Sequence, residues 1–379
     1  MNTIERLAEL GQSIWFDNIS RGMINTGELA ALVGQGLRGV TSNPTIFEKA
    51  ISGSKDYDTQ LKQLLERSPE METSEIIEAL MVKDIQTAAD VLMPVYERTN
   101  GGDGFVSIEV SPGNARDTEA TVEEARRLWT LVQRKNLMVK IPATREGLPA
   151  IERMLSEGIN INITLLFSVD RYREVANAYL TALEKRLNAG KAVDHVASVA
   201  SVFVSRIDTL VDGELQKKIS AGAPGSDVLR TLLGKAAVAN TKFTYHSFRE
   251  IFSGPRWDAL KAKGARLQRP LWGSTGTKNP AYSDLLYVDA LIGPHTVNTV
   301  PPKTWSAILD HGIPRLTIEE DLDGARTMLA ALRNAGIDLA WVMDKLEVEG
   351  VAAFKKSFDD LSRSLEEKRS EFAGIAQGR

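Results

Sequence analysis

The hexapeptide Leu137-Met138-Val139-Lys140-Ile141-Pro142 decides the fold class, because it is a nearly continuous apolar run. A strand that is apolar on both faces is typical of a parallel sheet covered by helices on both sides. Similar short runs recur along the chain and alternate with longer segments of helical periodicity, which predicts an α/β fold. We expect strands at Ser13–Asp17, Leu37–Thr41, Gly104–Val110, Leu137–Ile141, Ile159–Leu165, His195–Phe203, Leu267–Gly273 and Thr296–Val300.

Eight such strands without a break in composition favour a closed (β/α)₈ TIM barrel over an open doubly wound sheet. We therefore interpret residues 1–379 as a single domain. Additional helices are expected within Asp208–Lys263, which is too long for one βα unit and should hold two or three helices with a turn at Gly222–Gly225. A charged amphipathic segment at about 338–372 predicts a C-terminal helix that packs outside the barrel.

The composition of the chain excludes several classes of protein. A formal charge of -4 gives no basic surface for nucleic acid. No apolar run approaches the roughly 20 residues needed to cross a bilayer, and the N-terminus lacks the features of a secretory signal. The absence of cysteine excludes disulfides and thiolate metal sites, and the four histidines are far apart in the sequence. We expect a cytoplasmic monomer or homodimer without a metal ion.

Polar side chains interrupt or follow the expected strands near their C-terminal ends, which is where the active site of a parallel barrel forms. In chain order these candidates are Asp17, Thr41, Asn43, Glu109, Lys140, Asn162, Thr164, Ser201, Arg206, Ser274 and Lys278.

Lys140 carries the sharpest chemical signal of this set. Burial among apolar residues disfavours the charged form of a lysine and can lower its pKa from about 10.4 by up to about 3–5 units. The neutral amine that results can attack a carbonyl group. The alternative is a structural salt bridge from Lys140 to Glu109 or Asp17. The carboxylates on two earlier strands, and the hydroxyls and amides on the next, favour catalysis.

The other candidates also allow structural interpretations. Asp17 could cap the N-terminus of a helix, and Asn43-Pro44 could be a turn that opens a helix with proline in its first position. Glu109 is harder to explain in this way, since a buried carboxylate without a partner is costly. Arg206 and Lys278 could be surface charges, but arginine is suited to bidentate binding of a phosphate group.

Over nearly its whole length the chain resembles the transaldolase family, specifically its longer bacterial and plant-like branch. The motifs that carry the resemblance are Gly39-Val40-Thr41-Ser42-Asn43-Pro44, Val139-Lys140-Ile141-Pro142, the stretch from Gly158 to Ser168, Ser274-Thr275-Gly276-Thr277-Lys278-Asn279-Pro280 and Val297-Asn298-Thr299-Val300-Pro301. The resemblance implies transfer of a dihydroxyacetone unit between sugar phosphates in the pentose phosphate pathway, without a cofactor.

The resemblance also implies a role for each candidate. Lys140 would form a Schiff base, Asp17 and Glu109 would be the catalytic carboxylates, and Thr164 would help to position a water. The residues expected to bind substrate are Thr41, Asn43, Asn162, Ser201, Phe203, Ser274, Arg206 and Lys278. Arg206 matches a phosphate-binding arginine, whereas the family's second phosphate-binding arginine has no clear counterpart here, and Lys278 is the candidate for its role.

Two other functions compete with this one. Fructose-6-phosphate aldolases share the barrel and the lysine but release free dihydroxyacetone, and they typically carry Gln at the position of Glu109 and Tyr at that of Phe203. Glycosidases also use paired carboxylates. That function leaves Lys140 and the phosphate-binding candidates unexplained.

Overall fold

The protein is a closed barrel of eight parallel strands in chain order, within the residues that our computed structural model describes, 1–222 and 225–377. The strands are β1 (Gln12–Phe16), β2 (Gly39–Val40), β3 (Phe105–Glu109), β4 (Leu137–Pro142), β5 (Ile161–Leu166), β6 (Ser198–Phe203), β7 (Arg269–Gly273) and β8 (Thr296–Val300). Five residue pairs between β1 and β8 close the ring. The (β/α)₈ TIM barrel predicted from the sequence is confirmed.

Five of the strands are shorter than the sequence predicted, and β2 and β6 lose the most residues. The N–H of Leu37 donates to the carbonyl of Leu32 at the end of a helix, so this residue cannot join β2. The N–H of Val196 donates to the carbonyl of Val193 in a turn, and β6 therefore begins at Ser198 rather than at His195. In both cases a local hydrogen bond replaces a bond of the strand ladder.

Helices connect the strands and form the outer layer. They are α1 (Thr3–Glu9), α2 (Arg21–Asn25), α3 (Glu28–Gly34), α4 (Pro44–Ser52), α5 (Asp58–Arg67), α6 (Thr73–Arg98), the 3₁₀ turn η1 (Pro112–Asn114), α7 (Thr118–Val132), α8 (Gly147–Glu157), α9 (Val169–Asn188), α10 (Ser205–Ser220), α11 (Ser226–Leu232), α12 (Ala236–Ile251), α13 (Pro255–Lys261), α14 (Leu286–Asp289), α15 (Pro302–His311), α16 (Leu322–Asn334) and α17 (Leu339–Gln377). None of the helices in the described ranges is both long and apolar enough to span a bilayer.

The segment Asp208–Lys263 holds more helices than the two or three that we predicted. Helix α10 begins before it, and α11, α12 and α13 follow. Pro255 lies in the first turn of α13, where a proline is compatible with a helix. Part of the turn expected at Gly222–Gly225 lies outside the described residues, since 223–224 are not among them.

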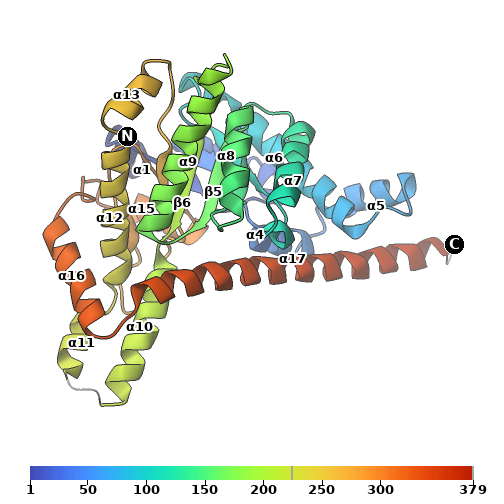
Figure 1. Cartoon of the computed structure of the whole chain (residues 1–379). Coiled ribbons are helices and arrows are strands. Elements are labelled where there is room, and N and C mark those ends of the chain that lie inside the picture. Colours follow the sequence, from blue (N-terminus) through green and yellow to red (C-terminus); the bar gives the residue numbers. More distant parts are fainter. Residues whose placement is uncertain (223–224, 378–379) are drawn as a thin grey trace.

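Helix α17 crosses one end of the barrel as a long, straight rod (Figure 1). It contacts β5, α4, α10 and η1, which places it over the C-terminal ends of the strands. Its polar contacts with the helices below include the hydroxyls of Ser357 and Thr45, which lie 2.8 Å apart, and Nζ of Lys368, which lies 3.0 Å from Oδ1 of Asp58. The helix therefore lies outside the ring of strands, above its mouth.

The interior of the barrel is built in layers, because alternate residues of each strand point inward. A buried apolar cluster between the polar ends consists of Trp15, Phe105, Met138, Ala197, Val199, Leu271 and Val297. Gly39 is required beside it, since a Cβ atom there would lie 2.4 Å from the ring of Trp15. Polar side chains fill both ends, and those at the C-terminal end include most of the candidates from the sequence.

Candidate active site

Lys140 is held inside the ring of strands between two polar neighbours. It pairs with Glu109 of β3 on one side and with Asn162 of β5 on the other, and only 4% of its surface is exposed. Its Nζ donates to the carbonyl oxygen of Ser42 at 2.8 Å and lies 3.1 Å from Oε2 of Glu109. The structure thus contains the ion pair that the sequence left open, at the end of the barrel where enzymes of this fold react.

Glu109 is buried beside Lys140 but is not fully satisfied there. Burial raises the pKa of the Glu109 carboxyl, and the nearby positive charge of Lys140 offsets this only in part. Apart from this ion pair with Lys140, Oε2 has no hydrogen-bond partner among the described residues. The hydroxyl of Thr164 on β5 is also buried without a partner in that part of the chain. Both groups can therefore bind a water or a reacting group.

Asp17 follows β1 directly and faces the same space. The hydroxyl of Thr41 donates to its Oδ1 at 2.8 Å and lies 2.6 Å from the hydroxyl of Thr299. Burial raises the pKa of the Asp17 carboxyl, which Lys140 and the Thr41 hydrogen bond lower less strongly. Ser20, not Asp17, caps α2. The helix-cap alternative for Asp17 is therefore wrong.

Three further polar residues line or support the wall of this space. Asn43 caps α4 through its Oδ1, which accepts from the N–H of Ile46 at 3.0 Å, and Pro44 follows in the first turn. Asn162 is held in the wall: its amide donates to Ser107 at 3.0 Å and its Oδ1 accepts from the hydroxyl of Ser201 at 2.6 Å. Asn43 thus serves the helix with its oxygen and can still offer its N–H₂ group to a ligand.

A cavity of about 270 Å³ opens at this end of the barrel. Of the residues expected from the sequence, it brings together Asp17, Thr41, Asn43, Lys140, Ser201, Phe203, Arg206, Ser274 and Lys278. Glu109, Asn162 and Thr164 are buried and do not line it. Glu109 reaches the cavity through its contact with Lys140, and Asn162 through Ser201.

Positive charge without an anionic partner lies around the cavity. Arg206 begins α10, and its guanidinium stacks over the ring of Phe203 at 5.1 Å. Burial lowers the pKa of Arg206, although Asp17 and Glu109 oppose this shift. Within the described ranges neither Arg206 nor the exposed Lys278 forms an ion pair. Because even partial burial of an unpaired cation is costly, Arg206 is suited to an anionic ligand.

The sequence did not single out several other residues of the cavity wall. Among them, Lys49 lies on α4, Thr299 lies on β8 and Phe354 comes from α17. Thr299 was part of a recognised motif and points inward two residues after Val297, so strand alternation could have found it. No signal in the sequence marks Lys49 or Phe354, since each is one of several similar residues on an amphipathic helix.

A larger hollow of about 770 Å³ lies elsewhere, lined by residues of α9, α12, α16, α17 and the adjoining loops. It contains neither the buried lysine nor the strand-end carboxylates, so it is not the candidate active site despite its larger volume. No group of three or more potential metal ligands is found among the residues that the structure describes.

Comparison with known proteins agrees with this geometry. A family model described as Transaldolase/Fructose-6-phosphate aldolase matches residues 14–365. The chain is 48% identical over 372 residues to a transaldolase of Trichodesmium erythraeum, covering 97% of each chain. It is 49% identical to the transaldolase of Acidothermus cellulolyticus, with 97% of this chain and 98% of the relative covered. With the transaldolase of Thermobifida fusca it shares 49% identity, over 94% and 96% of the two chains.

Proposed function

The chain belongs to the transaldolase/fructose-6-phosphate aldolase family, and from this premise we propose that it transfers a dihydroxyacetone unit from a ketose phosphate to an aldose phosphate. Donors of this class are fructose 6-phosphate and sedoheptulose 7-phosphate, and acceptors are erythrose 4-phosphate and glyceraldehyde 3-phosphate. The observation that carries the proposal is the buried Lys140 amine, which contacts Glu109 and opens on a cavity lined by Asp17. The relatives named transaldolase support the same function.

The first half of the reaction forms a Schiff base. Nζ of Lys140 adds to the C2 carbonyl of the ketose, and loss of water from the carbinolamine leaves an iminium ion. We assign the protons of these steps to Glu109, since burial raises the pKa of its carboxyl and so favours a group that can both accept and return a proton. The unpartnered hydroxyl of Thr164 is the group that we assign to positioning the water.

The second half breaks one carbon–carbon bond and forms another. Asp17 removes the proton of the C4 hydroxyl, the C3–C4 bond breaks, and its electron pair moves to the iminium. An aldose phosphate leaves, and an enamine of three carbons stays attached to Lys140. C3 of the enamine then attacks the carbonyl of the incoming aldose phosphate, and hydrolysis frees Lys140. Asn43 and Ser201 line the cavity where the bound fragment would lie.

The cationic residues of the mouth define the phosphate end. Arg206 lies at the start of α10 with no ion-pair partner in the described residues, and Lys49 and Lys278 line the same cavity. A guanidinium can bind a phosphate through two hydrogen bonds, and the lysines add point charges. We assign the sugar phosphate group to this cluster, which places the reactive carbonyl toward Lys140.

The second activity of the family, aldol cleavage with release of dihydroxyacetone, is the alternative. Glu109 and Phe203 favour transfer, because the aldolases typically carry Gln and Tyr at these positions. Product release with and without an acceptor aldehyde separates the two activities. A transferase should release little dihydroxyacetone without an acceptor and turn over when one is added.

Reductive trapping tests the proposal directly. Sodium borohydride added with fructose 6-phosphate should reduce the iminium and leave a three-carbon adduct on the peptide that contains Lys140, as read by mass spectrometry. Lys140→Met should abolish the adduct. Lys135→Met removes an exposed lysine that lies two residues before β4, and it should leave the adduct in place. An adduct that persists in Lys140→Met would overturn the assignment.

A further inference from the structure

The guanidinium of Arg206 lies near two aromatic rings from opposite parts of the chain. Its Cζ atom is 5.1 Å from the centre of the Phe203 ring on β6 and 5.9 Å from that of the Phe354 ring on α17. Phe354 is 3% exposed and forms part of the cavity wall. Arg206 thus packs against two aromatic rings and forms no ion pair within 4 Å among the described residues, which suits a cation that must remain free to bind an anion.

Gly350 allows α17 to come this close. A Cβ atom at this position would lie 2.8 Å from Cδ2 of Leu165 and 3.6 Å from Nη1 of Arg206. Leu165 is itself held in the left-handed region, with a φ of 54°, at an irregularity of β5. The helix therefore rests on a strained strand end and on Arg206, one turn before Phe354.

The position of Phe354 is fixed relative to the rest of the mouth. Ser357, three residues further along α17, contacts Thr45 of α4 at 2.8 Å. Helix α4 is the one that Asn43 caps and that carries Lys49, and both of these residues line the cavity. Helix α17 thus contacts Arg206 through Phe354 and contacts α4 through Ser357.

We propose that Phe354 is a positioning residue for Arg206 and that it makes the enzyme selective for phosphorylated over unphosphorylated sugars. Phe203 contacts the guanidinium on one side, but with this contact alone the long Arg206 side chain could still adopt other rotamers. Phe354 removes this freedom, so that little conformational entropy is lost when the phosphate binds. The inference rests on the proposed function, because it concerns the phosphate end of the same site.

Paired substitutions on α17 test the inference. Phe354→Leu removes the ring at Arg206, and Phe358→Leu removes a partly buried ring one turn further along. We would measure kcat and KM with fructose 6-phosphate and with fructose as donors, using unphosphorylated glyceraldehyde as acceptor. For Phe354→Leu, KM for fructose 6-phosphate should rise about tenfold with little change in kcat. Inhibition by inorganic phosphate should weaken by a similar factor. The kinetics with fructose should not change. Phe358→Leu should resemble the unchanged protein.

Phe354→Tyr keeps the ring and should restore selectivity, which provides a readout if Phe354→Leu does not fold. Equal losses for fructose and fructose 6-phosphate, or no difference between Phe354→Leu and Phe358→Leu, would overturn the inference. Borohydride trapping of dihydroxyacetone, which has no phosphate, separates this outcome from failure of the proposed function. If the unchanged protein is not trapped at Lys140, the proposed function fails. If trapping is normal and only the phosphate selectivity fails to change, this inference fails alone.

Discussion

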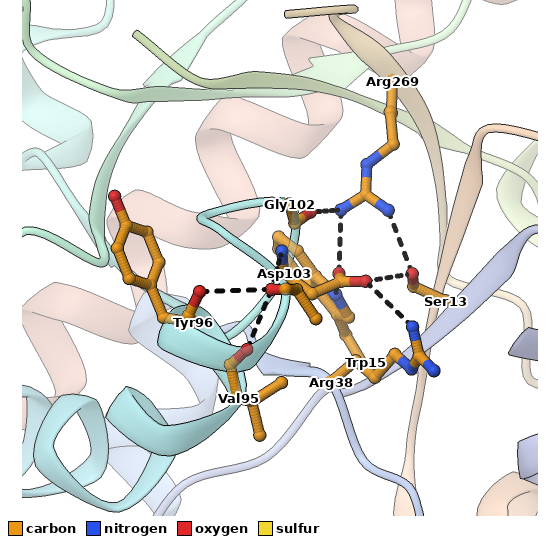
Figure 2. A network of polar contacts seen from close by, with 9 residues as sticks. Ser13, Trp15, Arg38, Val95, Tyr96, Gly102, Asp103 and Arg269 are labelled. Carbon is orange, nitrogen blue, oxygen red and sulfur yellow. Dashed lines mark hydrogen bonds and ion pairs between the residues drawn. The ribbon is translucent and has the colours of Figure 1, made fainter. Parts of the chain in front are cut away.

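The two polar ends of the barrel differ in how far their charged groups are satisfied. At the N-terminal end, Asp103 accepts hydrogen bonds from Ser13 at 2.6 Å, from Trp15 at 3.0 Å and from Arg269 at 2.8 Å, and Arg38 lies 3.7 Å away (Figure 2). Arg269 in turn donates to the hydroxyl of Ser13 and to the carbonyl of Gly102, both at 2.9 Å.

The C-terminal end is built from the same kinds of residue, with the opposite result. Oε2 of Glu109 and the hydroxyl of Thr164 lack hydrogen-bond donors or acceptors within the described residues, and Arg206 has no carboxylate partner there. Closed networks of buried charge hold a fold together, whereas open ones leave groups free for a substrate at a cost in stability. The comparison indicates that the N-terminal end serves stability and the C-terminal end serves reaction.

Asp17→Asn should give the largest effect on activity, with no loss of stability. We proposed Asp17 as the base that acts on the C4 hydroxyl, and removing such a base should lower kcat by about 10²–10⁴-fold. The neutral amide can still accept the hydrogen bond from Thr41. Steady-state kinetics and urea unfolding at pH 8 measure the two quantities.

The sign of the stability effect follows from the raised pKa of Asp17. Between the ordinary pKa of about 3.9 and the raised value, the folded state binds a proton that the unfolded state has lost, so stability falls as the pH rises through this window. Above the window the ionised carboxyl destabilises the fold, and the amide removes that cost. The gain should vanish near pH 4. A variant that is less stable than the parent at pH 8 would contradict the comparison.

Asp103→Ala should give the reverse result at the other end. It leaves Arg269, whose side chain is 16% exposed, without its carboxylate. Breaking a buried pair in this way should lower the free energy of unfolding by about 3–5 kcal/mol. The kcat of the folded fraction should stay within about twofold of the parent, because Asp103 does not line the cavity. Glu157→Ala, which breaks the exposed pair with Arg126, should leave the unfolding midpoint nearly unchanged.

The pH profile of kcat/KM should depend on the carboxyls of the C-terminal end of the barrel and not on Asp103 at the N-terminal end. Burial raises the pKa of both Asp17 and Glu109. If the ionised forms are needed, activity should rise with pH along a limb that lies above the ordinary carboxyl values of about 3.9 and 4.3. The rise should approach tenfold per pH unit below the apparent pKa, which belongs to the coupled groups together. Asp103→Asn should leave this limb in place, whereas a limb at the ordinary values would show that burial does not tune the carboxyls.

The sequence predicted the barrel and the strand-borne part of the site for a physical reason. Glu109 and Lys140 interrupt apolar strands, and parallel strands bring their C-terminal ends together, so both residues could be assigned to the active-site end of the barrel. The resemblance to a known family supplied the roles.

Contacts between distant segments could not be predicted in this way. The carbonyl of Ser42 accepts from Lys140 as a backbone group, which carries no mark in the sequence. Asp103 and Arg269 are 166 residues apart, and no periodicity relates them. Phe354 reaches Arg206 only because a glycine one turn earlier lets the helix descend onto the barrel.

The smallest expected effects concern the lysines of the mouth and test the idea that their charge is kept for substrate. Neither Lys49 nor Lys278 forms an ion pair in the described part of the chain, so replacing either with Met should leave the unfolding midpoint unchanged. Lys278→Met should raise KM for fructose 6-phosphate by about tenfold, the loss expected for one charge-assisted hydrogen bond. Lys49→Met should raise it by about two- to fivefold, as for a charge that stays solvated. Neither should change KM for fructose. Since a cation of the N-terminal end is fully paired, Arg269→Met should do the opposite, lowering stability and leaving KM unchanged. Equal effects of Lys278→Met on both donors would show that this residue does not bind the phosphate.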